Sequence, residues 1–297
     1  MIMGMAYTAK SAFAHNFSGD ESASFLAKVQ ELKVETQLIQ QNLSNQTIVG
    51  WHIDKISEFW NANDTKEMSE RNKRLGTEIP ALISNITTSA NSTSPDSAKI
   101  SQLITSLNND LAEAITVRID QTARNNATVN ALAIVNVLDE TMEDYGIATG
   151  VEEDEEDGGN MSMSEGENAA MPSDNMSESG SSNETTTTIV NAAAYQTAQG
   201  LAAAAQDMFN DLKAKAPANT TDTISKLDKG FADLKQAIDG KASNDNVTEI
   251  IHGPLMTNMQ TAFNLQVVPE FPLPLLLTIP AIAGIIAATR FNALKKK

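Results

Sequence analysis

Residues 94–119 read SPDSAKISQLITSLNNDLAEAITVRI, and their apolar side chains recur every three or four positions. Ser94 can cap a helix, and Pro95 suits the first helical position, where a backbone N–H has no partner in any case. The apolar positions that follow are Ile100, Leu103, Leu107, Leu111, Ile115 and Ile119. This spacing predicts an amphipathic helix that buries one face.

The same pattern resumes beyond residue 119 and ends near Tyr145. Its apolar positions are Leu132, Val135, Leu138 and Met142. Residues 95–145 therefore form either one long helix or two helices broken near Asn125–Asn126.

Most of the remaining chain has the same three-to-four spacing. It predicts helices over 19–42, 46–61 and 64–86, the last kinked at Pro80, and further helices over 189–214, 224–240 and 247–263, with a kink at Gly253–Pro254. No segment alternates as a strand does, and only 5% of the residues are aromatic. The fold class is therefore all-α, with up-down antiparallel helical bundles.

The acidity of the chain is concentrated in one part of it. The chain has 38 acidic and 21 basic residues, a net charge of -17, yet no Lys or Arg lies between Arg124 and Lys213. Residues 150–184 are acidic, rich in Ser, Gly and Met, and poor in large apolar side chains, which predicts a disordered linker. It separates a helical bundle at 15–149 from a three-helix segment at 185–266. So negative a chain repels nucleic acid, and we expect no nucleic-acid partner.

The C-terminal unit, 267–297, contains a long uncharged run. Residues 271–289 carry no charge and would span about 28 Å as a helix, close to the roughly 30 Å core of a bilayer. The basic residues Arg290, Lys295, Lys296 and Lys297 follow. We expect one C-terminal transmembrane helix, with the short tail in the cytoplasm and the preceding residues outside the cell membrane.

The N-terminus has features of an export signal. Residues 1–14 are mostly apolar and end in Ala12-Phe13-Ala14, a small-x-small pattern that suits cleavage after Ala14. Because Lys10 interrupts the run and no basic residue precedes it, residues 1–14 are either an imperfect signal peptide or the remnant of a truncated one.

Sequons for N-glycosylation are frequent outside the apolar run. The composition, 26 Asn and 50 Ser plus Thr, predicts about four by chance, and the chain has twelve. They begin at Asn16, Asn42, Asn45, Asn63, Asn85, Asn91, Asn126, Asn160, Asn175, Asn183, Asn219 and Asn246. Because all twelve lie on the side expected to be outside, we expect a glycoprotein, although several Asn also suit helix caps.

The sequence contains few residues that carry chemistry. It has no cysteine, which excludes disulfides, thiolate zinc sites and thiol catalysis. Its three histidines are isolated, and His52 lies in line with Ile48 and Ile56 as a partly buried core residue would. No phosphate-binding, dinucleotide-binding or serine-hydrolase motif occurs, so we expect no enzyme; a site assembled only in the fold is the remaining alternative.

One arrangement of residues suits copper. Cleavage after Ala14 would leave His15 at the mature N-terminus, where its amine and imidazole can chelate a metal ion. Thioethers in the acidic linker favour Cu(I). They belong to Met161, Met163, Met171 and Met176. A surface protein that binds copper or a solute is therefore the alternative function.

Residues 267–297, VVPEFPLPLLLTIPAIAGIIAATRFNALKKK, carry a resemblance. The motif Pro269-Glu270-Phe271, the apolar run and the basic tail resemble the C-terminal sorting signals of archaeal surface proteins, of the kind found in ammonia oxidisers. Pro272 stands where that kind has Gly. The helical body also resembles uncharacterised surface proteins of that group. The resemblance implies a structural or interaction role at the cell surface, with surface-layer proteins or a sorting enzyme as partners.

Overall fold

The computed structural model describes residues 21–151 and 187–265, and all regular structure within these ranges is helical. The α-helices are α1 (Glu21–Gln41), α2 (Gln46–Phe59), α3 (Ala62–Arg71), α4 (Lys73–Ala90), α5 (Ser97–Arg118), α6 (Gln121–Asn125), α7 (Ala127–Thr149), α8 (Ala192–Leu212), α9 (Thr221–Asp239), α10 (Asn244–Ile250) and α11 (Met256–Phe263). The all-α prediction is confirmed for the described ranges. Within these ranges, no helix combines the length and the apolar composition of a membrane span.

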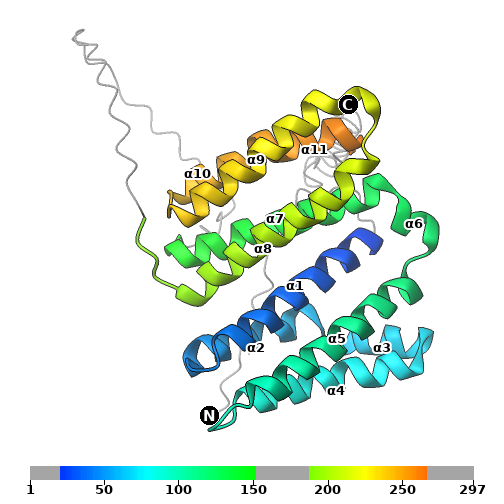
Figure 1. Ribbon diagram of the computed structural model, residues 1–297, viewed down its shortest axis with the longest axis vertical. Helices are drawn as coiled ribbons and strands as arrows, with labels where there is room; N and C mark the ends of the chain where they lie inside the picture. The colour runs from blue at the N-terminus through cyan, green and yellow to red at the C-terminus, as the bar shows by residue number, and fades with distance from the viewer. Residues whose placement is uncertain (1–20, 152–186, 266–297) are drawn as a thin grey trace, which may run out of the picture.

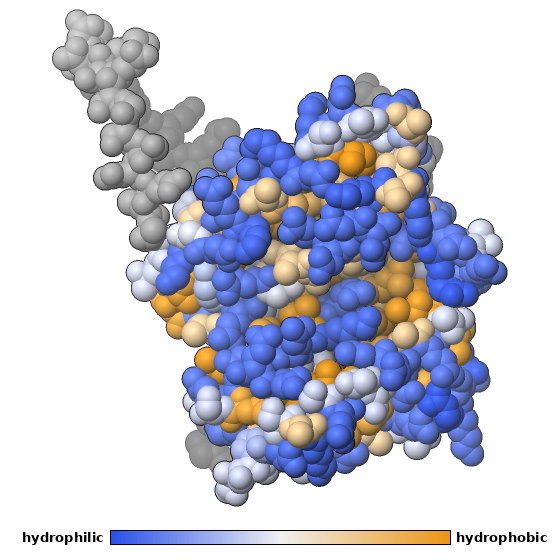
Figure 2. Space-filling view, viewed as in Figure 1, coloured by the Kyte–Doolittle hydropathy of each residue, from blue (hydrophilic) through white to orange (hydrophobic). Residues whose placement is uncertain are grey.

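The helices are stacked in successive layers (Figure 1). Helices α3, α4 and α5 lie at one end, α1 and α2 come next, then α7 and α8, and α9 to α11 lie at the other end. Helices joined by short loops, such as α1 and α2 or α4 and α5, pack as antiparallel neighbours. The face of the molecule drawn in Figure 2, which is the one seen in Figure 1, is mostly hydrophilic, with hydrophobic residues in smaller separate areas.

Two apolar clusters form the core, and α1 contributes to both. Ala23 and Ala27 belong to the cluster that contains α7 to α11, whereas Phe25, Val29 and Leu32 belong to the cluster of α2 to α5. Positions 23 and 27 thus lie on one face of α1, and positions 25, 29 and 32 lie on the opposite face. The segments on the two sides of residues 152–186 share the first cluster, so the division seen in the sequence does not separate two cores.

Two turns differ from the sequence-based prediction. Asp96, not Ser94, caps α5, because its carboxylate accepts a hydrogen bond from the backbone N–H of Lys99. The predicted helix over 64–86 breaks at Asn72, while α4 continues through Pro80. Asn72 has an extended backbone, and its side chain accepts hydrogen bonds from the first turn of α4, which explains a break without Gly or Pro.

The long pattern over residues 95–145 is broken, as one of the two alternatives predicted. Asp120 caps the short helix α6, and Asn126 then caps α7. The kink predicted at Gly253–Pro254 lies in a single π-helical turn, Ile251–Leu255, between α10 and α11. Proline has no N–H to donate, so the regular pattern of hydrogen bonds is interrupted there.

Candidate functional site

Nine polar side chains from four helices and the turn after α1 lie between the two apolar clusters, and we call them the polar seam. They are Glu31 and Glu35 of α1, Asn42 in the turn after it, His52 and Lys55 of α2, Glu140 and Asp144 of α7, and Gln196 and Thr197 of α8. Six of the nine are buried, all but Asn42, Glu140 and Gln196. Buried polar groups are costly unless they have partners, so this group is the part of the described structure in which a function is most naturally sought.

One end of the seam is centred on a buried acid–histidine pair. Oε2 of Glu35 lies 2.7 Å from Nδ1 of His52, and both side chains are fully buried. The hydroxyl of Thr197 donates a hydrogen bond of 2.8 Å to the other oxygen of Glu35. Both carboxylate oxygens therefore have a partner, and α1, α2 and α8 are joined at one point.

Two amides extend this network toward the end of α1. Asn42 donates to the side-chain oxygen of Gln196 at 2.8 Å and to the backbone oxygen of Leu38 at 2.8 Å. Gln196 donates back to Asn42 at 3.3 Å. Nε2 of His52 lies 3.4 Å from the same Gln196 oxygen, so both ring nitrogens of His52 face acceptors.

The other end of the seam is centred on Lys55, which is 5% exposed. Its Nζ lies 3.0 Å from Glu140, 3.2 Å from Asp144 and 3.7 Å from Glu58. It also lies 5.7 Å from the ring centre of Phe59. Burial alone would lower the pKa of Lys55, but attraction to Asp144 and Glu140 outweighs it and raises the pKa above its usual value. Lys55 is therefore a buried ammonium.

Two carboxyl groups of the seam have raised pKa values. Burial raises the pKa of Glu31 well above its usual range, and Glu140 adds to the effect. Burial also raises the pKa of Asp144, although Lys55 opposes it. Neither oxygen of Asp144 is in a well-aligned hydrogen bond despite its closeness to Lys55. Glu31 is 8% exposed and has no hydrogen bond or ion pair with the residues described.

Asp139, next to Glu140 on α7, lies at the edge of this group. Burial, followed by repulsion from Glu140, raises the pKa of the Asp139 carboxyl to about 7. This carboxyl therefore changes its charge near neutral pH.

The arrangement has more buried acids than cations. The seam contains four carboxyl groups and one ammonium, that of Lys55, and burial raises the pKa values of two of these carboxyls, Glu31 and Asp144. In the described ranges, no three His, Asp or Glu side chains converge in a way that would hold a metal ion. The seam can therefore bind protons and fix the pairing of four helices.

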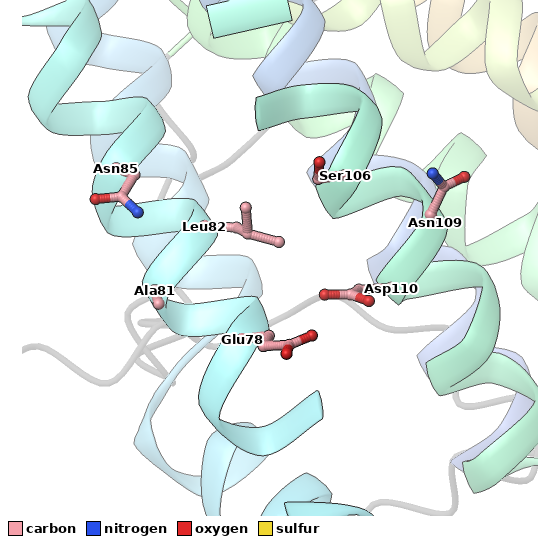
Figure 3. Close-up of a pocket in the computed structure, with 7 residues that line it drawn as sticks. All are labelled: Glu78, Ala81, Leu82, Asn85, Ser106, Asn109 and Asp110. Atoms are coloured by element: carbon pink, nitrogen blue, oxygen red, sulfur yellow. The ribbon is translucent and has the colours of Figure 1, made fainter. Parts of the chain in front are cut away.

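Two surface hollows flank the body. A groove of about 450 Å³ runs between α4 and α5. Figure 3 shows Glu78 and Leu82 of α4 and Asp110 of α5 directed into the gap between the two helices. A second hollow of about 360 Å³ lies between α2 and α7 and is lined by Glu58, Phe59, Glu140 and Glu143. It adjoins the Lys55 end of the seam through Glu140.

The sequons that the structure describes are mostly at the surface. Seven of the eight asparagines are exposed: Asn45, Asn63, Asn85, Asn91, Asn126, Asn219 and Asn246. Asn45 and Asn126 are helix caps. The sequence had instead suggested Asn63, Asn219 and Asn246 as caps, but Asn61, Thr220 and Ser243 hold those positions. Asn42 is the exception, because its amide belongs to the polar seam.

Many predicted site residues lie outside the described ranges. They are the sorting motif Pro269, Glu270 and Phe271, the tail residues Arg290, Lys295, Lys296 and Lys297, the sequons at Asn16, Asn160, Asn175 and Asn183, and the copper candidates His15, Met161, Met163, Met171 and Met176. The predicted disordered linker at 150–184 and the transmembrane helix also fall largely or wholly there.

Sequence reasoning identified His52 as a core residue but did not find its partners. His52 is fully buried, more deeply than predicted. A signal was present in α1, where Glu31 and Glu35 are four positions apart on a face that also buries Ala27. Charged residues on the buried face of one helix need polar partners on a neighbouring helix.

No protein-family model, curated protein or solved structure matches the chain.

Proposed function

We propose that the chain is a membrane-anchored, N-glycosylated extracytoplasmic helical protein with a structural or interaction role at the cell surface. One observation supports this most directly: seven of the eight described sequon asparagines are exposed. Glycans are bulky and require surface positions. Sequon asparagines on the buried faces of helices would therefore argue against glycosylation, whereas exposed ones support it.

The organisation of the body is consistent with a scaffold. The polar seam turns its charged groups toward one another and joins α1, α2, α7 and α8 at defined positions. Buried polar contacts of this kind specify which helices pair and in which register. A body fixed in this way can present its outer helices, such as α4 and α5, to partners.

Residues 267–297 supply the anchor in this proposal. The apolar run 271–289 crosses the bilayer, the four basic residues after it stay in the cytoplasm, and a sorting enzyme or surface-layer protein recognises the outer side. The resemblance of Pro269-Glu270-Phe271 to archaeal sorting motifs supports this part.

Protease treatment of intact cells tests the topology. The full chain would carry one epitope in the α2–α3 turn and another after Lys297. Externally added protease should remove the first epitope and leave the second, and permeabilised cells should lose both. Recovery of the intact chain from the cytosol, with both epitopes protected in whole cells, would contradict the proposal.

A further inference from the structure

The groove between α4 and α5 is the larger of the two hollows described above, at about 450 Å³. This volume lies within the roughly 300–1,000 Å³ of pockets that hold small ligands. The side chains that line it from α4 recur three and four positions apart, so they share one face of that helix. The lining consists of Glu78, Ala81, Leu82 and Asn85 of α4 and Ser106, Asn109 and Asp110 of α5.

The chemistry of the lining suits a carbohydrate. Sugar hydroxyls donate and accept hydrogen bonds, and the groove offers carboxylates that accept, amides that do both, and the hydroxyl of Ser106. Arg74 pairs with Glu78 and Asp110 at one end of the groove, and among the described residues it uses only one oxygen of each carboxylate. The second oxygens are left to accept from a ligand. An apolar peptide would fit less well, because the half-buried Leu82 is the largest apolar side chain of the lining.

Asn85 places an attachment point for sugar in the groove itself. It begins the sequon Asn85-Ile86-Thr87, its side chain is exposed, and it is the one described sequon asparagine that lines either of the two hollows. Figure 3 shows it on α4, across the gap from Ser106 of α5. Glu78 is two helical turns away along α4, about 10 Å at about 1.5 Å per residue. A glycan linked to Asn85 therefore begins beside the other polar groups of the lining.

We propose that the α4–α5 groove is a carbohydrate-binding groove whose occupant is the N-glycan on Asn85 of the same chain. Its first sugars lie along the gap from Asn85 toward Glu78 and Asp110, with hydroxyls hydrogen-bonded to Ser106 and to the two carboxylates. A tethered ligand has a high effective concentration, so contacts too weak to hold a free sugar are enough here. The glycan thereby joins α4 to α5. This inference rests on the proposed glycosylation and adds which glycan has a fixed place on the body.

A double-mutant cycle on the full-length chain, purified from its native cells, tests the contact by thermal unfolding. Ser106→Ala removes a groove hydroxyl, and Thr87→Ala removes the sequon at Asn85 without changing the lining. In the glycosylated chain Ser106→Ala should lower the Tm by about 2–4 °C more than it does in the Thr87→Ala background, as the loss of one hydrogen bond would.

Ser225→Ala on α9 is the matched control. Ser225 and Ser106 are both exposed, and each donates to a backbone oxygen four residues earlier at 3.1 Å. Since Ser225 is far from the groove in the chain and does not line it, its replacement should shift the Tm equally in both backgrounds. Thr87→Ser preserves the sequon and should behave as the wild type does.

Glycopeptide mass spectrometry of the same samples separates this inference from the proposed function. Glycans at other exposed sequons with Asn85 bare would overturn the groove's occupant and leave the proposed glycoprotein standing. A glycan at Asn85 with equal effects of Ser106→Ala in both backgrounds would also overturn it, because the glycan would then make no contact with α5. The absence of glycans from all sequons would overturn both the occupant and the proposed glycosylation.

Discussion

Oε2 of Glu35 lies 2.7 Å from Nδ1 of His52, and neither side chain is exposed to solvent. Removing one member of a buried pair leaves the other without a partner, which typically costs about 3–5 kcal/mol. We expect Glu35→Ala to lower the free energy of unfolding by an amount of this order, because it strands both His52 and the hydroxyl of Thr197.

Urea unfolding of the full chain measures this effect. Glu70 is exposed on α3, and Glu70→Ala is the matched control, expected to change stability by less than about 0.5 kcal/mol. Glu35→Gln keeps the shape of the side chain and should cost less than Glu35→Ala. Equal midpoints for Glu35→Ala and Glu70→Ala would show that the pair contributes nothing to stability.

The carboxyl of Asp139 gives the fold an unusual dependence on pH. Its pKa is raised to about 7 by burial and by Glu140, so the folded chain holds a proton that the unfolded chain has already released. The stabilisation from this group is complete below the unfolded-state pKa, near 4, and is lost as the pH rises through about 7. Glu31 and Asp144 act in the same direction, since their pKa values are also raised.

Thermal unfolding of Asp139→Asn and wild type across about pH 5 to 8 tests this prediction. The amide cannot ionise, so the variant should gain Tm relative to wild type as the pH rises from about 5, and the difference should level off above about 7. A difference that is constant with pH would show that Asp139 does not titrate in this range in the folded chain.

The sequence predicted the helices well and the seam poorly, because a single sequence reports contacts between near neighbours in the chain and not contacts between distant residues. A helix is encoded by neighbours three and four positions apart, and Ile100, Leu107 and Leu111 identify α5 from local spacing. The seam joins residues far apart in the chain, such as Glu35 and Thr197, so no local pattern reports it. The break at Asn72 was missed because the capping contacts of this side chain are visible only in three dimensions.

Gly76 permits the close approach of α3 and α4. A Cβ atom placed there would lie 2.5 Å from the Cα of Ser69 and 2.6 Å from its backbone nitrogen, and backbone atoms cannot turn away as a side chain can. We expect Gly76→Ala to destabilise the fold by about 1–3 kcal/mol or more, as overpacking does. The control is Gly50→Ala in α2, where a Cβ meets nothing within 4 Å. It should stabilise the helix by about 0.5–1 kcal/mol, since glycine is unfavourable inside a helix. Tm shifts of the same sign for both variants would contradict the close packing of α3 on α4.

The described residues that flank segment 152–186 on its two sides are hydrogen-bonded to each other and to the body. The backbone N–H of Val190 donates to the oxygen of Ala148 at 2.8 Å, and that of Thr187 donates to the oxygen of Lys241 at 2.7 Å. Helices α7 and α8, on either side of this segment, pack against each other extensively. We therefore expect the body to fold without residues 152–186. Replacing 152–186 by a Gly/Ser linker should leave the helical circular dichroism signal per helical residue and the Tm unchanged. A large fall in Tm would show that the segment contributes to the core.

Asn42 and Asn45 begin two sequons only three residues apart, yet they lie in different surroundings. The Asn42 amide donates to Leu38 and to Gln196 inside the seam, whereas the Asn45 side chain is exposed and accepts one backbone N–H as the cap of α2. If the proposed glycosylation occurs on the folded chain, Asn45 should carry a glycan and Asn42 should not, because a glycan at Asn42 would replace the amide hydrogens that bind the seam. Glycopeptide mass spectrometry on protein from its native cells distinguishes the two sites. Thr47→Ala should abolish modification at Asn45, and Ser44→Ala should change nothing. A glycan at Asn42 in folded protein would show either that modification precedes folding or that the amide contacts of the seam do not form.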